Sequence, residues 1–283
     1  LTRIERNIKE DRDDISWGPN AVFQFPQHGG TGDIWRRVAA RFSDNIVLNK
    51  EVQSIDVKKH SVHFTDGTSD SYDVLLTTMP LDLLVKKQKG ISLPIARPLH
   101  HSSVTIVGIG VKGETPTNLS TKCWMYFPET KAPFFRATVF SNYSKYNAPK
   151  GSWSLMTEIA SSRYVQLPTG DIGKISVEGA RRMKLLPKGA RIESVWTFRS
   201  DYGYPTPNLT RDAYLAYVLP KLEKYDIYSR GRFGAWKYEV SNQDHTFMQG
   251  VEWVNHTLQL EPEVTVWHPQ IVNNRQSQKT NDV

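Results

Sequence analysis

The chain has 283 residues, 39% of them hydrophobic and 23% charged, which excludes a disordered chain and leaves room for one large domain or two ordinary ones. The net charge of +7 attracts anions, but the basic residues are scattered, which argues against a nucleic-acid surface. No apolar run reaches the length of a membrane span.

Cysteine usage and glycosylation sequons bear on the compartment. A single cysteine, Cys123, cannot form an internal disulfide, which favours a reducing environment. No signal peptide precedes the four Asn-x-Ser/Thr sequons, so a cytoplasmic location is favoured. These sequons begin at Asn118, Asn142, Asn208 and Asn255. The sequence begins with Leu1 instead of Met, and we expect a fragment or a processed form.

The first third of the chain predicts a helix end, a helix and a β-meander. Residues 1–16 are typical of the end of a helix, and a short alternating run follows at 22–25. Glycines at 29–32 open an amphipathic helix with one apolar stripe, formed by Ile34, Val38 and Phe42. Alternation predicts strands at 52–57 and 61–64, a hairpin turn at Asp66-Gly67 and a buried strand at 72–77.

The remaining chain predicts an antiparallel sheet followed by alternating helices and strands. Alternating runs at 103–111, 134–140 and 153–159 favour strands of one antiparallel sheet. A helix is expected near 177–185, a strand at 192–198, a helix around Leu215–Leu222 and a strand at 236–240. A long final helix carries Phe247, Val251, Val254 and Leu258 on one face. The pattern indicates a mixed α/β (α+β) fold with an inserted antiparallel sheet.

Two glycine or capping patterns are weak candidates for a phosphate site. Ser241 has the chemistry of an N-cap, and the helix that follows presents free N–H groups that suit a phosphate or a polar ring edge. An ordinary capped helix explains the same pattern and is favoured without other information. The Gly29–Gly32 run lacks the Gly-x-Gly-x-x-Gly spacing and the Walker lysine, so a tight turn explains it equally well.

Aromatic residues around Arg136 form the third candidate site. Trp124–Pro128 and Ser141–Tyr143 place phenols near this arginine in sequence, and a guanidinium can clamp a pyrophosphate with two nitrogens. A solvated arginine on a strand is the simpler alternative. A turn-rich stretch, Tyr202–Pro207, either supports a site or connects two elements. The eight histidines show no metal-ligand spacing.

Five runs in chain order resemble the eukaryotic UDP-galactopyranose mutases, and together they cover nearly the whole chain. They are Trp17–Asn20 with Phe25-Pro26 and Gly29–Trp35; Cys123–Glu129; Phe134–Thr138 with Phe140–Tyr143; Gly203–Pro207; and Ser229–Gly234 running on to Tyr238–His245.

The resemblance implies part of a Rossmann-like FAD-binding domain with an inserted antiparallel β-sheet substrate domain. The expected order is the end of a helical substrate domain (1–16), FAD-binding domain (17–107), sheet domain (108–199) and FAD-binding domain again (200–283). The implied activity is an isomerase that interconverts UDP-galactopyranose and UDP-galactofuranose for cell-wall biosynthesis. It uses reduced FAD, without net redox change, through a flavin–sugar adduct. The implied partners are these UDP-sugars and further copies of the chain, with neither nucleic acid nor membrane.

The resemblance also implies a role for each matching residue. Arg136, Tyr204 and Arg232 match catalytic positions, with Arg136 on the pyrophosphate and Arg232 near the flavin. Substrate-binding positions are matched by Asn20, Tyr126, Arg136, Tyr143, Tyr204 and Tyr238. Cofactor-binding positions are matched by Val52, Arg232, Ser241, Asn242, Gln243 and Thr246.

The sequence departs from the family pattern at several points. Ser241 and Asp33 stand where the family has glycine, and a β-carbon at 241 would limit a close backbone approach to the cofactor. The Gly-x-Gly-x-x-Gly strand, a histidine-bearing loop, most of the helical domain and a second pyrophosphate arginine have no counterpart. Two alternatives therefore stay open: a flavin oxidase of the amine-oxidase type, which the tyrosine and arginine set argues against, and a non-catalytic nucleotide-sugar-binding remnant.

Overall fold

The computed structural model describes residues 2–11, 24–128 and 131–273. The chain divides into two compact units, one of residues 25–242 and one of residues 1–24 with 243–283. The fold is mixed α/β with several sheets, as predicted from the sequence. The domain boundaries drawn from the family resemblance remain a prediction.

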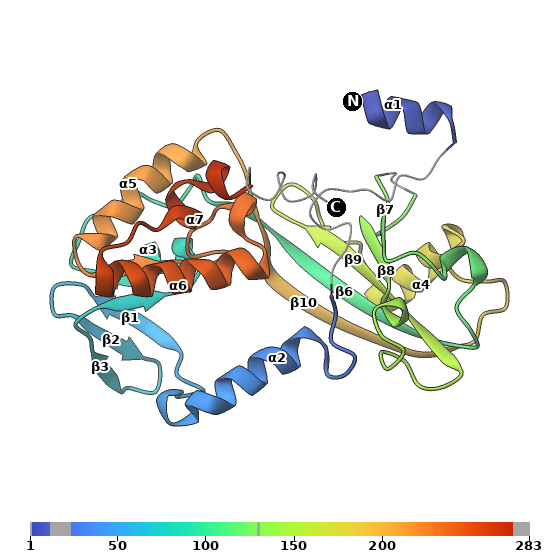
Figure 1. Cartoon of the computed structure of the whole chain (residues 1–283), viewed down its shortest axis with the longest axis horizontal. Coiled ribbons are helices and arrows are strands. Elements are labelled where there is room, and N and C mark those ends of the chain that lie inside the picture. Colours follow the sequence, from blue (N-terminus) through green and yellow to red (C-terminus); the bar gives the residue numbers. More distant parts are fainter. Residues whose placement is uncertain (1, 12–23, 129–130, 274–283) are drawn as a thin grey trace. The chain divides into compact units, whose positions relative to one another are not determined.

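A five-stranded antiparallel sheet dominates the unit of residues 25–242. Its strand order is β10-β6-β9-β8-β7, and its two longest strands run side by side in Figure 1. The strands are β6 (His100–Lys112), β7 (Trp124–Tyr126), β8 (Arg136–Val139), β9 (Ser152–Ser161) and β10 (Ile192–Thr206). The antiparallel sheet predicted from the alternating runs is therefore confirmed.

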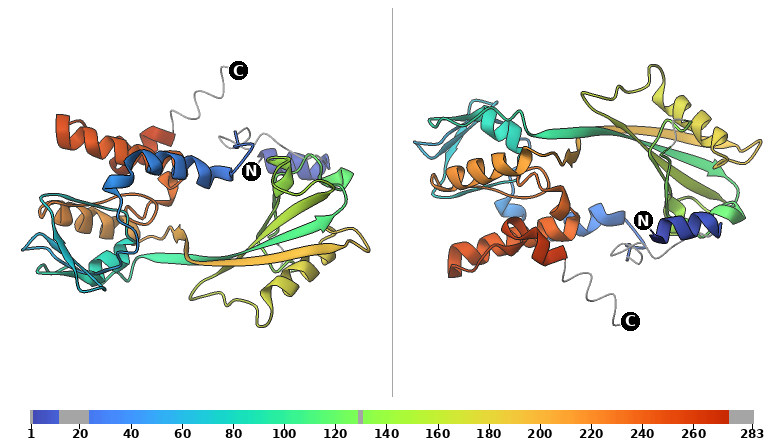
Figure 2. Two further views of the ribbon diagram at one scale, coloured as in Figure 1. Left: turned by 90° about the horizontal axis from the view of Figure 1, so that it is seen from below. Right: turned by 90° about the horizontal axis from the view of Figure 1, so that it is seen from above.

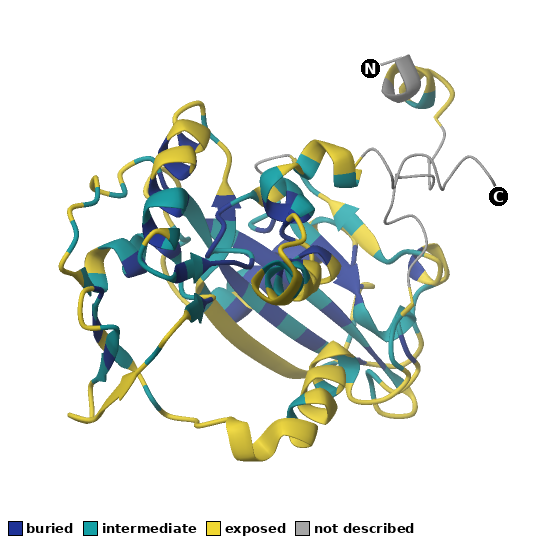
Figure 3. Ribbon diagram, turned by 60° about the vertical axis from the view of Figure 1, so that its left-hand side comes forward, coloured by how far each residue is buried: buried dark blue, intermediate teal, exposed yellow. Residues whose placement is uncertain are grey.

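Strand β10 continues further than its alternating run predicted. It includes the turn-rich stretch up to Thr206, which a bulge between Ser200 and Tyr204 joins to the rest of the strand. Proline 205 is tolerated because β10 is an edge strand and a bulge lies beside it. Figure 3 shows the inner strands largely buried, whereas the first half of β10 is exposed.

One face of this sheet packs against helix α4 (Ile172–Arg182), as both views in Figure 2 show, and we call it the helix face. Its core holds Val107, Ile109, Leu155 and Ile159, which are at most 2% exposed. Thr157 on β9 contacts Ser176 of α4 through their hydroxyls. Because side chains alternate along a strand, the neighbours of these residues, including Glu158, point to the opposite face, which we call the site face.

Two smaller sheets belong to the same unit. The first has the order β3-β2-β1-β5 and confirms the predicted strands at 52–57 and 61–64, with Gly67 at φ +84° in the predicted turn, which leads into β3. The second is the parallel pair β4 and β11, so the strand predicted at 72–77 is shorter than expected and lies outside the first sheet. The strands are β1 (Val52–Asp56), β2 (Ser61–Phe64), β3 (Ser69–Ser71), β4 (Leu75–Thr77), β5 (Gln88–Lys89) and β11 (Ile227–Ser229).

Helices α3 (Leu81–Lys87) and α5 (Arg211–Glu223) complete this part of the core. The helix predicted around Leu215–Leu222 is confirmed, and its buried face packs against β11. The strand predicted at 236–240 is wrong. Trp236 has φ +56° and residues Tyr238–Val240 form a 3₁₀ turn, η5. A left-handed residue cannot continue a strand, and alternation alone does not reveal one.

Helix α2 (Gly30–Ala39) begins at the glycine run, followed by η2 (Ala40–Asn45). Gly29 and Gly30 have φ values of +73° and +64°, which confirms the tight-turn interpretation of this run. Asp33 pairs with Arg37 at 2.7 Å, and this hydrogen bond is the main reason that the pKa of Asp33 is lowered. Short 3₁₀ turns η3 (Thr117–Leu119) and η4 (Phe140–Asn142) lie in the sheet connections.

The unit of residues 1–24 and 243–283 contains α1 (Thr2–Lys9), α6 (Gln243–Gln259) and α7 (Val264–Trp267). The long final helix predicted from the sequence is thus confirmed. Of the helix end predicted at 1–16, Thr2–Lys9 is helical, and residues 12–16 lie outside the described residues, as do residues 22–23 of the run at 22–25. Glu252 of α6 accepts hydrogen bonds from the Thr265 amide and hydroxyl, at 2.8 and 2.9 Å, and so fixes the start of α7. No helix within the described ranges has the length and apolarity to cross a membrane.

Candidate functional site

A row of cross-strand neighbours on the site face brings charged and aromatic side chains together. The strand register pairs Tyr126 with Arg136 and Arg136 with Glu158. Directly opposed residues on neighbouring strands point to the same side of a sheet. The row therefore places an arginine between a phenol and a carboxylate, on the face that α4 does not cover.

Arg136 is held by three hydrogen bonds. Its Nε and Nη2 atoms donate to the two carboxylate oxygens of Glu158 at 2.6 and 2.7 Å, and Nη2 also donates to the Tyr204 hydroxyl oxygen at 2.8 Å. The Glu158 side chain is 5% exposed and that of Arg136 is 21% exposed. A paired fork of this kind fixes the guanidinium plane, so that the arginine is oriented before any ligand arrives.

The charge state of the cluster follows from these contacts. Burial alone lowers the pKa of Arg136, but the hydrogen bonds and negative charge of Glu158 outweigh burial and raise it, so the guanidinium stays charged. Burial raises the pKa of Tyr204, while the Arg136 charge opposes the rise. At neutral pH the cluster thus offers a fixed cation and a neutral phenol.

Two further side chains surround Tyr204. The Arg232 guanidinium carbon lies 5.3 Å from the centre of the Tyr204 ring, and the Tyr238 ring centre lies 6.4 Å from it. Cation–π contacts of this kind stabilise a positive charge beside an aromatic ring. Arg136, Tyr204, Arg232 and Tyr238, which the sequence separates by up to 102 residues, therefore form one cluster with Tyr126.

Tyr143 lies at the next part of the same face. Its ring is perpendicular to that of Trp124, with centres 6.2 Å apart, and it also packs against Phe25 at 5.2 Å. Burial raises its pKa well above the ordinary value. The Arg136 charge acts on this group too, so Tyr143 belongs to the same electrostatic neighbourhood.

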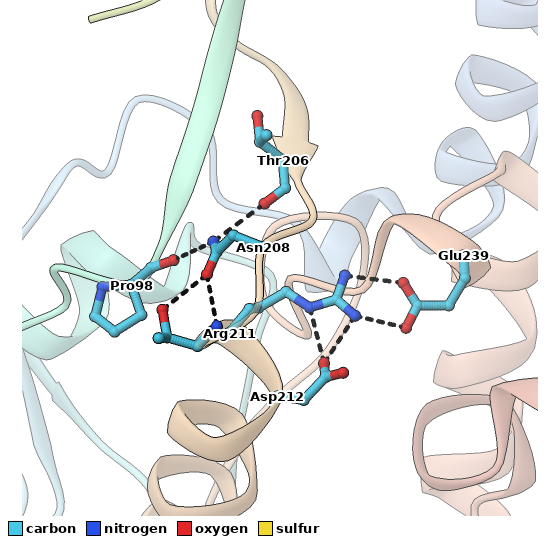
Figure 4. A network of polar contacts seen from close by, with 7 residues as sticks. Pro98, Thr206, Asn208, Arg211, Asp212 and Glu239 are labelled. Atoms are coloured by element: carbon cyan, nitrogen blue, oxygen red, sulfur yellow. Dashed lines mark hydrogen bonds and ion pairs between the residues drawn. The ribbon is translucent and has the colours of Figure 1, made fainter.

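A second arginine network supports the loop that carries Tyr238, and Figure 4 shows it at close range. Arg211 on α5 donates from Nη1 and Nη2 to the two carboxylate oxygens of Glu239, both at 2.9 Å, and from Nε to Asp212 at 2.9 Å. Asn208 adds a hydrogen bond to the Pro98 carbonyl at 2.7 Å. Glu239 directly follows Tyr238 in η5, so this network anchors the turn beside the site.

Residues matched to the cofactor do not all lie in this cluster. Val52 starts β1, where its carbonyl accepts a hydrogen bond from Lys87 Nζ at 2.5 Å. Ser241 is 3% exposed and donates to the Tyr238 carbonyl at 2.9 Å, and α6 begins two residues later. The N-cap role predicted for Ser241 is therefore wrong, because its hydroxyl closes the η5 turn.

The remaining matched residues lie elsewhere. Asn242 is exposed at the end of the larger unit, and Gln243 and Thr246 begin α6 in the other unit, with the Thr246 hydroxyl donating to the Gln243 carbonyl at 3.0 Å. Asn20 lies outside the described residues. In the parts of the chain that the structure describes, no group of three or more His, Cys, Asp or Glu could hold a metal ion.

Sequence reasoning missed Glu158, Glu239 and Arg211. Glu158 could have been noticed, since it is the one carboxylate inside an otherwise apolar or hydroxyl-bearing run at 153–159. A charged residue at such a position needs a partner, because a buried unpaired carboxylate is strongly disfavoured. Which residue pairs with it depends on the β8–β9 register, which no local pattern encodes.

These elements define an α/β protein with an arginine–tyrosine site on an antiparallel sheet. A solved structure of a CLA-producing fatty acid isomerase from P. acnes shares this fold, with a TM-score of 0.57 and 15% identity over 81% of this chain and 52% of that chain. At that identity the likeness concerns the fold alone. No family model matches the sequence.

A second solved structure gives the particular relationship. It is a reduced UDP-galactopyranose mutase, with a TM-score of 0.91 and 46% identity, covering 96% of this chain. The resemblance predicted from the sequence is confirmed: this chain is a relative of the UDP-galactopyranose mutases. It spans 61% of the length of that mutase.

Proposed function

We propose that this chain contributes the diphosphate-gripping part of an FAD-dependent isomerase that interconverts UDP-galactopyranose and UDP-galactofuranose. The observation that carries the proposal is the Arg136 cluster, in which a charged guanidinium is fixed by Glu158 and Tyr204. The 46% identity to a UDP-galactopyranose mutase supports the choice of substrate.

The cluster suits a UDP-sugar for electrostatic reasons. A diphosphate carries negative charge on oxygens that accept several hydrogen bonds, and guanidinium and phenol groups are donors. Arg136 donates to the Tyr204 hydroxyl oxygen, and Arg232 lies over the Tyr204 ring. In the proposed complex Arg136 binds the diphosphate, and Tyr126, Tyr143, Tyr204 and Tyr238 donate to it or close over the sugar, with Asn20 on the uridine.

The residues matched to the flavin fit a polar cofactor. Ser241 has φ −113° and ψ 5°, a conformation open to any L-residue, so serine in place of glycine introduces no backbone strain. The N-terminus of a helix carries a partial positive charge and backbone N–H groups, and that of α6 (Gln243–Gln259) therefore suits a flavin ring edge. We propose that Asn242, Gln243 and Thr246 line this cofactor, with Arg232 beside the ring and Val52 at the adenine.

When bound, reduced FAD supplies the nucleophilic ring nitrogen for the isomerisation, and the protein supplies orientation and charge. In this proposal Arg136 keeps the leaving diphosphate fixed and charge-balanced, while neutral Tyr204 holds a proton that it donates in a hydrogen bond. A cytoplasmic location and a role in galactofuranose supply for the cell wall are part of the proposal. The Asn142 and Asn208 amides support it, since both donate internally instead of presenting acceptor sites for glycans.

The test is turnover of UDP-galactofuranose with FAD and dithionite, comparing the wild-type chain with Arg136→Lys and with Arg191→Ala. Lysine keeps the charge but cannot bond Glu158 and a diphosphate in a planar fork, so turnover should fall at least tenfold. Arg191 is exposed and directly precedes β10, and its removal should leave turnover unchanged. Equal rates for the wild type and Arg136→Lys would refute the proposed role of Arg136.

A further inference from the structure

A cavity of about 520 Å³ lies at the end of the large sheet where β6 begins and β9 ends. Two arginines and two histidines line it, namely Arg163, Arg199, His100 and His101. Hydroxyl groups of Ser103, Ser161, Ser162 and Thr206 accompany them, and no carboxylate or lysine is among the lining residues. Arg199 Nε also pairs with the exposed Asp201 carboxylate at 2.9 Å, so the unpaired positive charge of the wall comes mainly from Arg163, while both arginines still offer hydrogen-bond donors.

This cavity lies at the end of the sheet, and no member of the Arg136 cluster is among its lining residues. It draws on both faces, because His100 and Thr206 pair with each other two residues beyond the Ser102–Tyr204 pair and so share the side of Tyr204, whereas Ser161 and Arg199 belong to the helix face. Glu158 belongs to the site face, and Ser161 is three residues further along β9, so its side chain points to the other face. Phe198 pairs with Ile106, which pairs with Glu158, so Phe198 is on the site face and its neighbour Arg199 is not. The bond from Arg199 Nη1 to Ser161 Oγ, at 3.3 Å, is consistent with this assignment.

The loop that carries Arg163 is held in place before any ligand binds. The Ser162 hydroxyl accepts from the amides of Tyr164 and Val165, at 3.1 and 3.2 Å, and the Ser162 amide donates to the Val165 carbonyl at 2.8 Å. This turn brings the Arg163 guanidinium into contact with the ring nitrogens of His100. The hydrogen bonds of Ser162 therefore fix the position of Arg163 before any ligand binds, which reduces the entropy lost on binding.

An aromatic platform lies next to the cationic groups. The Tyr164 and His100 rings are stacked, with centres 6.0 Å apart and planes inclined by 20°. Burial, and then the Arg163 charge, lowers the pKa of His100, so at neutral pH the ring is uncharged and can accept from Arg163. Leu99, Val165 and Leu167 add apolar surface to the same wall.

We propose that this cavity is a second ligand site, for a phosphate-bearing small molecule with an aromatic base. Arg163 and Arg199 bind the phosphate, because guanidinium groups offer paired donors to phosphate oxygens. The stacked Tyr164 and His100 rings receive the base, as flat aromatic groups do in nucleotide pockets. The volume lies inside the range of about 300–1,000 Å³ usual for small-ligand sites. The proposal goes beyond the isomerase function and does not depend on it.

The experiment is calorimetric titration of the wild-type chain with adenosine 5′-monophosphate, and separately with inorganic phosphate. Saturable binding of the nucleotide is expected, with inorganic phosphate competing at lower affinity. Arg163→Ala and Arg199→Ala should each weaken nucleotide binding at least tenfold, and Tyr164→Ala should weaken the nucleotide but not phosphate. All three side chains are largely exposed or at the cavity rim, so circular dichroism should show an intact fold.

Two control variants separate this site from the proposed isomerase site. Arg191→Ala removes the same charge just before β10, outside the cavity, and Arg136→Ala disables the other cluster. Both variants should bind the nucleotide within twofold of wild type. Absence of saturable binding overturns the proposal. So does an affinity that Arg163→Ala and Arg199→Ala leave unchanged, or one that only Arg136→Ala abolishes, since that result would assign the nucleotide to the isomerase site.

Discussion

Two arginines in this protein each grip a glutamate with two nitrogens, yet their surroundings differ. Arg211 has a second carboxylate, Asp212, at 2.7 Å and is 6% exposed, so two negative charges surround one cation. Arg136 has one carboxylate, a phenol and a second arginine near that phenol, and it is 21% exposed. The first arrangement is electrically satisfied, whereas the second retains positive charge on an accessible face.

This difference distinguishes a network that stabilises the fold from one that we propose binds a ligand. We call the Arg211 network the frame and the Arg136 cluster the site. Arg211 joins α5 to the turn that carries Tyr238, and its donors are directed to Glu239 and Asp212, so its contribution is to stability (Figure 4). Arg136 is oriented by Glu158 but lies among exposed or half-buried phenols, which we propose to receive the ligand. Variants of the first pair should therefore change unfolding, and variants of the second should change ligand binding.

The largest effect is expected from Arg211→Met, which should lower the free energy of unfolding by about 3–5 kcal/mol because it removes the charge-assisted hydrogen bonds of a buried guanidinium to Glu239 and Asp212. Urea denaturation followed by circular dichroism measures this. UDP affinity of the folded variant should stay within about threefold of wild type. The double variant Arg211→Met with Glu239→Met should regain much of the lost stability. A double variant less stable than the single one would show that Arg211 and Glu239 contribute to stability by more than their charge pairing.

Arg136→Ala should weaken UDP binding by about 2–4 kcal/mol, through loss of the charge-assisted contact to the diphosphate. Calorimetry with UDP measures it. This variant also leaves the buried Glu158 unpaired, so adding Glu158→Gln should restore stability without restoring UDP affinity. If the double variant recovered UDP binding, the role assigned to the Arg136 guanidinium would be contradicted.

The sequence allowed much of this site to be predicted, for an identifiable reason. Arg136, Tyr204 and Tyr238 could be named because they lie in short runs that resemble those of the mutase family. The structure brings them together with Arg232. The alternating strands of the large sheet were equally local patterns. Glu158 and Arg211 were missed, because what gives each its role is a partner 22 or 28 residues away.

Local backbone conformation was the second feature that could not be predicted from the sequence. The apolar, alternating run at 236–240 predicted a strand, but Trp236 has positive φ and is fully buried, with its indole nitrogen donating to the His100 carbonyl at 3.2 Å. That long-range bond outweighs a weak local preference. Conversely, Tyr202–Thr206 contains Gly and Pro and still continues β10, because the neighbouring strand β6 supplies the pairing.

The free energy of unfolding at alkaline pH should test the part of the molecule around α5 separately from the Arg136 cluster. Burial, with the charge of Asp82, raises the pKa of Tyr214 on α5 to about 12, and its hydroxyl donates to the Pro94 carbonyl at 2.9 Å. Between the ordinary pKa near 10 and that value, the folded state keeps a proton that the unfolded state has lost. Stability should therefore fall as pH rises from about 10 to 12, by at most about 1.4 kcal/mol per pH unit from this group. Tyr214→Phe should flatten the profile measured by urea titration at each pH, and an unchanged slope would assign the loss to other phenols.

Tyr204→Phe should give the smallest effect and the most specific one, because it removes a hydroxyl and little else. Without its oxygen, Arg136 Nη2 loses one acceptor but keeps both bonds to Glu158, so the fold and the arginine orientation should persist. We expect a fall of about 1 kcal/mol in transition-state stabilisation, or roughly fivefold in UDP-galactofuranose turnover. The unfolding free energy should change by less than about 0.5 kcal/mol. Tyr214→Phe serves as the matched control, since it removes a buried phenol hydroxyl from α5 and should leave turnover unchanged. If Tyr204→Phe instead lowers stability and leaves turnover intact, Tyr204 stabilises the fold as Arg211 does. The Arg136 cluster would then exclude Tyr204.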